Sequence, residues 1–175
     1  MNKNEIIELL RNNYGQFIDY LTGLSQEDLD YHFENKWSAG EQLQHIVKSI
    51  SPLTKAFGMP KAMIAENFGE TDRVNSSYDE LIDKYLGKLE EGGKAPSRFL
   101  PASSDPVNRK TLIKKLTNDL EALISLIGQF EEEELETLQL PHPLLGPISL
   151  KEMLYHAIYH VNHHLLQAQT YLERK

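Results

Sequence analysis

The chain has 175 residues, of which 40% are hydrophobic, and this suits a single globular domain over residues 1–175. The absence of cysteine excludes disulfides, thiolate metal ligands and a cysteine nucleophile, and it fits a cytoplasmic protein. At a net charge of −8, we expect no general attraction to nucleic acid or to an anionic membrane surface. The sequence contains no apolar run of about 18 residues, so no membrane span is predicted. The polar start of the chain does not resemble a signal peptide.

Helical periodicity predicts two long helices in the first third of the chain. The first spans about residues 4–21, and a short turn or helix follows around residues 25–29. The second begins at Ser38-Ala-Gly-Glu41, where Ser38 can cap the first amides while Glu41 reaches back, an arrangement called a capping box. We expect Pro52 to kink or end this helix, because proline lacks an amide donor and clashes with the preceding turn.

The middle of the chain is predicted to be less regular. Residues 58–76 are expected to form an irregular connection, and a third helix spans about residues 78–90. Glycine, proline and serine make residues 91–106 the most loop-like stretch. A fourth helix is predicted over about residues 109–130, and the acidic run at its exit, residues 131–134, is interpreted as a solvated surface.

The last third is predicted to contain a proline-constrained loop and a long final helix. The loop covers residues 140–148, and Ser149-Leu-Lys-Glu152 is a second capping box from which a helix extends to about residue 172. No segment shows the alternating pattern of a strand, so the chain is predicted to be all-α. Four long helices with short extra ones indicate a bundle, in which metal and ligand sites form between facing helices.

Four of the seven histidines lie close together on the predicted last helix. Residues four apart share one face of a helix, so two imidazoles at that spacing can bind one metal ion. His160 and His164 lie at or near the edge of the core-facing arc, whereas His156 and His163 lie toward the polar side. His160 and His164 are therefore the predicted pair, and Gln167, one turn later, is a candidate donor to a ligand or to the site.

His45, on the second helix, is the candidate third ligand. Three nitrogen ligands would leave one coordination position open, as in catalytic rather than structural zinc sites. Two plainer interpretations remain open, because a histidine pair at this spacing is often surface decoration and His45 alone fits a hydrogen-bonded flank residue. His32 and His142 are interpreted as non-ligands, although His142 is a candidate for the mouth of a site.

Nearby residues receive structural interpretations. Trp37, just before a helix cap, is predicted to anchor the core or to act as a hydrophobic staple. Tyr155 and Tyr159 fall on the face of the last helix away from its apolar stripe, so we expect them, with Leu166, to cover a partner or subunit surface. Glu41 lies within helical reach of His45, but its capping role explains it fully.

Two motifs resemble the DinB-like superfamily. Trp37-Ser-Ala-Gly-Glu-Gln-Leu-Gln-His45 resembles the start of that superfamily's second helix, and His160-Val-Asn-His-His164-Leu-Leu-Gln167 resembles its final-helix pattern His-x-x-x-His-x-x-Gln. The resemblance spans nearly the whole chain and implies an up-down-down-up four-helix bundle that is often a homodimer. It also implies a metal site of His45, His160 and His164. One departure is Leu165-Leu166, which stands where Arg-Gly is frequent.

The resemblance further implies a chemistry. Zinc or nickel is the usual ion, and activities in the superfamily include thiol S-transfer with bacillithiol or mycothiol, thiol-dependent isomerisation and metal-dependent hydrolysis. The leading hypothesis is a metal-dependent enzyme acting on a small molecule, with a low-molecular-weight thiol or water at the open position. The alternatives are a non-enzymatic metal-binding, stress-related or interaction protein, and a hydrogen-bonded histidine seam without metal. A deep, open cavity over the histidines would favour catalysis.

Overall fold

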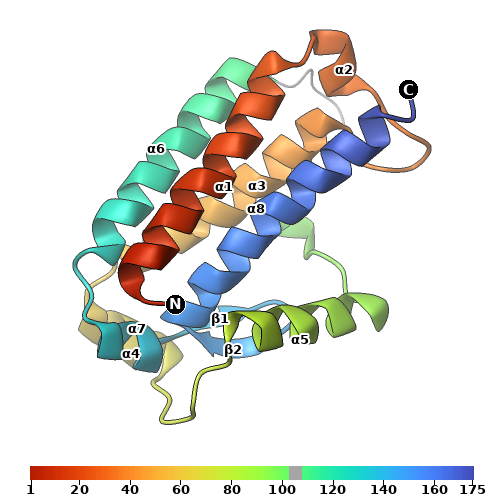
Figure 1. The fold of residues 1–175 in the computed structure, drawn as a ribbon. Helices are drawn as coiled ribbons and strands as arrows, with labels where there is room; N and C mark the ends of the chain where they lie inside the picture. The colour runs from red at the N-terminus through yellow and green to blue at the C-terminus, as the bar shows by residue number, and fades with distance from the viewer. Residues whose placement is uncertain (103–107) are drawn as a thin grey trace.

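The computed structural model describes residues 1–102 and 108–175, and its core is a bundle of four long helices (Figure 1). α1 (Lys3–Gly23) and α8 (Leu150–Leu172) run upward in that view. α3 (Ala39–Phe57) and α6 (Arg109–Ile127) run downward, beside each other. The predicted all-α fold with an up-down-down-up bundle is therefore confirmed.

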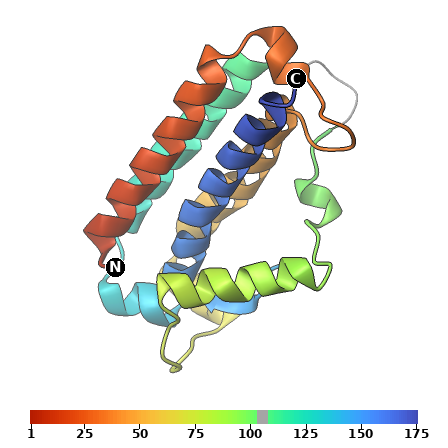
Figure 2. The same ribbon diagram turned by 45° about the vertical axis from the view of Figure 1, so that its right-hand side comes forward.

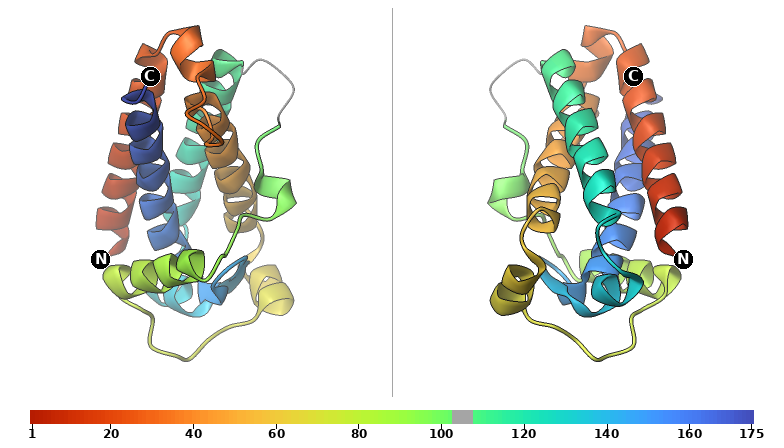
Figure 3. Two further views of the ribbon diagram at one scale, coloured as in Figure 1. Left: turned by 90° about the vertical axis from the view of Figure 1, so that its right-hand side faces the viewer. Right: turned by 90° about the vertical axis from the view of Figure 1, so that its left-hand side faces the viewer.

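Shorter elements lie at the two ends of the bundle, as the two opposite views of Figure 3 show. α2 (Gln26–Asp30) lies at one end, and η1, a 3₁₀ turn (Ser97–Phe99), lies beside α3. The other end is closed by three helices and a two-stranded antiparallel sheet: α4 (Lys61–Phe68), α5 (Tyr78–Glu90), α7 (Glu132–Thr137), β1 (Gln139–His142) and β2 (Gly146–Ser149).

The two predicted capping boxes are present and fix where the site-bearing helices begin. The amide of Glu41 donates to Ser38 Oγ, and the amide of Ser38 donates to Glu41 Oε2 at 2.9 Å. Ser149 and Glu152 make the same pair of bonds at the start of α8. Each box satisfies amides that a helix start leaves without partners, and this sets the rotational phase of the residues that follow.

Glu152 also ties α8 to the segment that precedes α5. Its buried carboxylate accepts hydrogen bonds from the amide of Ser76 at 2.8 Å and from the guanidinium of Arg73. Burial raises the pKa of Glu152, but these bonds and the one from Ser149 outweigh it and lower the pKa to about 2. The carboxylate is therefore ionised and fully engaged at the base of α8.

The core lies between the four long helices. Their apolar stripes meet there, and each buried leucine, isoleucine or phenylalanine side chain contributes about 1.5–3 kcal/mol. Fully or almost fully buried members include Phe17, Leu43, Ile46, Leu116, Leu123, Leu154 and Val161. Of the described helices, none is long and apolar enough to cross a membrane.

The prediction of a loop over residues 140–148 was wrong. The segment forms the β1–β2 hairpin, in which Pro141 and Pro147 face each other. Strands of four residues are too short to show alternation, and proline pointed to a loop because it cannot donate to a strand ladder. Gly146, at the start of β2, has φ 74°, a conformation that glycine adopts without strain.

Three helix predictions also need correction. Residues 58–76 contain α4, and α6 ends at Ile127 rather than near residue 130, with the acidic run opening the separate helix α7. Acidic residues suit that position because they complement the positive end of the helix dipole. Of the two outcomes expected at Pro52, a kink or an end, the end is excluded: α3 continues to Phe57, where Leu53 and Phe57 are buried and their packing outweighs the lost hydrogen bond.

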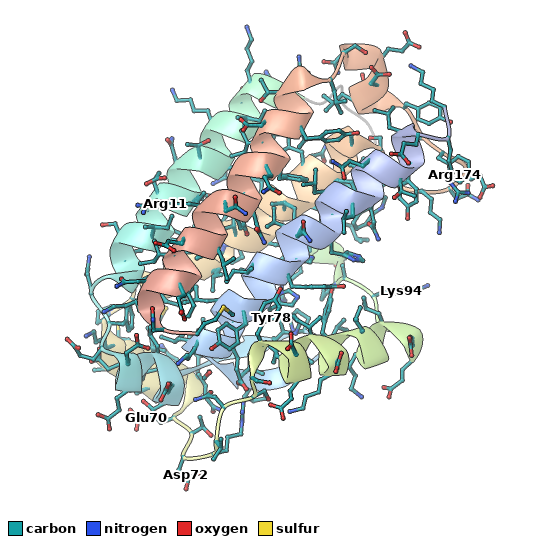
Figure 4. All side chains as sticks on the ribbon, in the orientation of Figure 1. Arg11, Glu70, Asp72, Tyr78, Lys94 and Arg174 are labelled. Carbon is teal, nitrogen blue, oxygen red and sulfur yellow. The ribbon has the colours of Figure 1, made fainter. Side chains whose placement is uncertain are left out.

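The face of α8 that was predicted to be exposed is covered by α5. Tyr155 is only 3% exposed and packs edge-on against Tyr78, whose ring centroid lies 5.8 Å away. Figure 4 shows Tyr78 at the start of α5, beside α8. Tyr159 is half-buried with its ring centroid 6.0 Å from that of Tyr85, so the expected tyrosine surface is an intramolecular contact. Leu166, 54% exposed, does face solvent.

Candidate metal centre

Three buried histidines from two helices converge near the middle of the bundle. His45 comes from α3, and His160 and His164 come from successive turns of α8. The Nε2 atom of His160 lies 3.1 Å from that of His45 and 3.0 Å from that of His164. One nitrogen from each ring lies within 4.8 Å of the other two. The structure thus brings together the three residues singled out from the sequence, and we call them the histidine triad.

The opposite ring nitrogens of two triad members are held by oxygen atoms. Nδ1 of His45 donates to the carbonyl oxygen of Phe99 at 2.9 Å, and Nδ1 of His164 donates to Oε1 of Gln42. Such outer partners fix the tautomer and the orientation of histidines that bind metals. Both bonds turn Nε2 toward the centre of the triad, which is the arrangement that a shared ion requires.

These hydrogen bonds leave the centre of the triad short of protons. The carbonyl and amide oxygens only accept, so Nδ1 of His45 and of His164 each carries the proton of its neutral ring and Nε2 carries a lone pair. Nε2 of His160 lies between them and can donate at most one proton. At least one of these two contacts therefore has no proton between its nitrogen atoms, which repel each other at about 3 Å. A cation bound by the three nitrogens would relieve this repulsion, so the donor set fits a divalent metal.

Burial keeps the triad in the form that binds metals. Loss of hydration lowers the pKa of His45 and lowers those of His160 and His164 well below 6.5. Neighbouring imidazoles push in the same direction, while the bond to Phe99 opposes the shift at His45. All three rings are therefore neutral at pH 7, with nitrogen lone pairs available.

The triad opens onto a cavity of about 960 Å³. Its wall is largely apolar, and Trp37 forms part of it, with its ring centroid 5.0 Å from that of His45 and 6.1 Å from that of His164. The prediction that Trp37 anchors the core was wrong, because the residue is half-buried and covers the triad instead. A volume of this size is typical of small-molecule sites.

The other histidines lie outside the triad. His32 is exposed and bonds to Glu41 at 2.9 Å, in keeping with its interpretation as a non-ligand. His142 lines the cavity, as suggested, and its Nδ1 accepts the amides of Leu144 and Leu145. His163 accepts a hydrogen bond from Nε2 of Gln167 at 2.9 Å, and both residues line the cavity.

His156 is more enclosed than its helical angle indicated. Its ring lies 4.3 Å from that of His142, 4.7 Å from that of Tyr85 and 4.9 Å from that of His160, measured between centroids. Its Nε2 is buried without a hydrogen-bond partner among the described residues. α5 and the hairpin supply this cover. We call His142 and His156, whose rings are in contact, the His142–His156 pair.

Sequence reasoning missed the two groups that orient the triad. Gln42 is fully buried one turn before His45, and a glutamine in an apolar stripe was a signal that could have identified it. Phe99 contributes only its backbone carbonyl, from a segment interpreted as loop, so its residue type carried no signal. The predicted capping role of Glu41 is confirmed.

Comparisons with known proteins agree with this architecture. The family model described as DinB superfamily matches residues 9–168. A crystal structure of a conserved protein from Enterococcus faecalis is similar with a TM-score of 0.59 and 14% identity, covering 99% of this chain and 96% of that one. At that identity the likeness shows the fold alone, and no curated protein matches significantly. Since the family model covers nearly its whole length, the chain belongs to the DinB superfamily.

Proposed function

We propose that the protein is a metal-dependent enzyme acting on a small molecule, with His45, His160 and His164 binding one zinc or nickel ion. The observation that carries this proposal is the convergence of three neutral Nε2 atoms, two of them oriented through Nδ1, at the wall of a large cavity. Three protein ligands leave a position for a reacting molecule, as catalytic zinc sites do.

When bound, the ion would lower the pKa of a thiol or water and polarise a substrate atom. The residues of the chain do the rest. Phe99 and Gln42 hold two imidazoles in place, and Trp37 shields the triad from solvent on one side. The cavity then positions the second reactant beside the triad.

Of the two reaction classes, thiol S-transfer receives more support than hydrolysis. A thiol bound to a divalent ion loses its proton outright and needs no separate base. Among the described residues that line the cavity there is no aspartate or glutamate, so activation of water would depend on the ion or on a histidine. Because the chain has no cysteine, the thiol must be a cosubstrate.

The cavity also favours an enzyme over the non-enzymatic alternative. A purely structural metal site is closed by a fourth protein ligand. Here the described histidine, cysteine and acidic residues offer a cluster of three, and the space next to it is large enough for a substrate. A metal-binding protein without activity would not require that space.

Metal content tests the proposal directly. Untagged protein, purified without a metal column, is analysed by elemental mass spectrometry beside a variant carrying His160→Ala and His164→Ala. We expect about one zinc or nickel per chain in the parent and none in the variant. Parent protein that contains no metal and takes none up on addition would overturn the proposal.

Activity assays then separate the reaction classes. Metal-loaded protein is mixed with a low-molecular-weight thiol and an electrophile, and separately with carboxylic and phosphate esters. Thioether formation that disappears in the double variant supports thiol transfer, and ester cleavage without thiol transfer supports hydrolysis. If both assays show only the rates of the double variant, the enzymatic proposal fails even though the metal is bound.

A further inference from the structure

The charges around the cavity differ sharply from those of the whole protein. The chain carries 26 acidic and 18 basic residues, yet none of the described residues that line the cavity is acidic. Three lining residues are cations, namely Lys36, Lys94 and Arg98. Among the described residues, this acidic protein therefore lines one concave surface with positive side chains and with no negative ones.

The three cations lie at the exposed edge of the cavity and come from two segments. Lys36 belongs to the loop before α3, and Lys94 and Arg98 belong to the segment after α5. Figure 2 shows these two segments on the same side of the bundle, beside α3 and α8. Lys94 is labelled in Figure 4, at the outer end of the segment after α5. Their side chains form no ion pair with any described carboxylate.

The inner wall has the opposite character. Leu53, Phe68, Leu89, Leu140 and Met153 give the cavity an apolar wall. Gln42 lines the same cavity near His164, and its fully buried Nε2 has no hydrogen-bond partner among the described residues. A buried amide donor without a partner is destabilising, so a ligand that accepts its hydrogen bond gains affinity.

We infer that the cavity binds an organic anion with an apolar body, its negative group at Lys36, Lys94 and Arg98 and its body against the apolar wall of the cavity that the triad also lines. This inference names the substrate class of the proposed enzyme and in that sense rests on the proposed function. Charge complementarity carries the argument: cations at the edge attract an anion, and the absence of carboxylates among the described lining residues removes repulsion.

The experiment compares three probes that share one apolar body: 4-phenylbutyrate, 4-phenylbutylamine and 4-phenylbutan-1-ol. Trp37 is the only tryptophan and lines the cavity, so its fluorescence reports occupancy. We expect the acid to bind at least about tenfold more tightly than the amine, and this preference to shrink as salt is added, because salt screens exposed charges.

Two matched variants locate the source of the preference. The double variant Lys94→Gln, Arg98→Gln is expected to reduce the tenfold preference to about twofold or less. The control Lys110→Gln, Lys114→Gln makes the same charge change at exposed positions of α6, outside the cavity lining, and should keep the preference. Thermal unfolding verifies that both variants fold.

Three results would overturn the inference: equal binding of acid and amine, no saturable change with the acid, or a preference that survives in the Lys94→Gln, Arg98→Gln variant. Repeating the titration with a chelator present separates this inference from the proposed function. A preference for the acid that persists in protein shown to bind no metal would keep the anion site and reject the metalloenzyme. Bound metal without any charge preference would do the reverse.

Discussion

Two groups of histidines line the same cavity, and they are built in different ways. In the histidine triad, Nε2 of His160 lies 3.0–3.1 Å from Nε2 of the other two rings, while oxygen atoms accept hydrogen bonds from two of the Nδ1 atoms. In the His142–His156 pair the ring centroids lie 4.3 Å apart, slightly closer than the 4.5–4.9 Å between the ring centroids of the triad. The pair shares no hydrogen bond between its described nitrogen atoms.

The difference shows that closeness of imidazoles does not make a metal site. His142 uses Nδ1 to accept two backbone amides and stabilise the turn between β1 and β2. His156 packs between aromatic rings. Only in the triad do outside acceptors orient two rings so that lone pairs converge, and this orientation is what a metal ion would use.

The largest expected effect is on metal affinity, when one histidine of the triad and one of the His142–His156 pair are replaced in turn. His160→Ala should weaken zinc affinity by about 100- to 1,000-fold, because it removes one of three ligands. His156→Phe, which keeps a ring against Tyr85 and His160, should change the affinity by less than about threefold. Competition with a chromogenic chelator measures both. Equal losses in the two variants would mean that the distinction drawn between the groups is wrong.

The next effect is the pH dependence of the free energy of unfolding that His142, in the His142–His156 pair, contributes. Burial lowers the pKa of His142 from 6.5 to about 4, so between these values the unfolded state binds more protons. The stability that depends on neutral His142 is complete above pH 6.5 and is lost as pH falls toward 4, by up to about 3 kcal/mol. His142→Asn keeps an acceptor for the turn amides but does not titrate.

Urea unfolding of the parent and of His142→Asn at several pH values between 6.5 and 4 measures this contribution. The free energy of unfolding should fall less steeply with decreasing pH in the variant. Parallel curves would show that His142 does not contribute to the acid sensitivity. The parent should still lose some stability from its other buried histidines, whose pKa values burial also lowers.

A smaller effect tests the outer support of the triad. Gln42→Leu removes the acceptor of the His164 Nδ1 proton and should weaken metal affinity by about 10- to 100-fold. Gln42→Glu keeps an acceptor and should retain or increase the affinity. The same chelator competition serves here, with circular dichroism to verify the fold. A Glu variant as weak as the Leu variant would show that the acceptor at residue 42 does not matter.

Local signals predicted the helices and the triad well. The capping boxes Ser38–Glu41 and Ser149–Glu152 correctly predicted where α3 and α8 begin. Once these starts are known, helix geometry places His160 and His164 on one face. His45 was the candidate third ligand from the residues alone, the resemblance to the DinB-like superfamily implied the same set, and the structure brings the three together.

Long-range packing could not be predicted in the same way. Tyr155 and His156 lie on the polar side of α8 by helical angle, but α5 covers them in the folded chain. The position of α5 depends on the segment before it, where Arg73 and the amide of Ser76 donate hydrogen bonds to Glu152 of α8. These bonds leave no periodic pattern in the sequence. The hairpin was not predicted for a related reason. Pairing between β1 and β2 compensates for the prolines within them, and this pairing is not visible in either segment alone.

The bond from His45 to Phe99 has a consequence for mutagenesis and redesign. The acceptor is a peptide carbonyl, so no exchange of the Phe99 side chain removes it. Alanine scanning will pass over this support, and comparison of residue types across related chains will not reveal it. Changes in the length of the segment after α5 are the ones that matter. A laboratory that grafts a new loop there to alter the cavity would need to keep one carbonyl in place opposite α3.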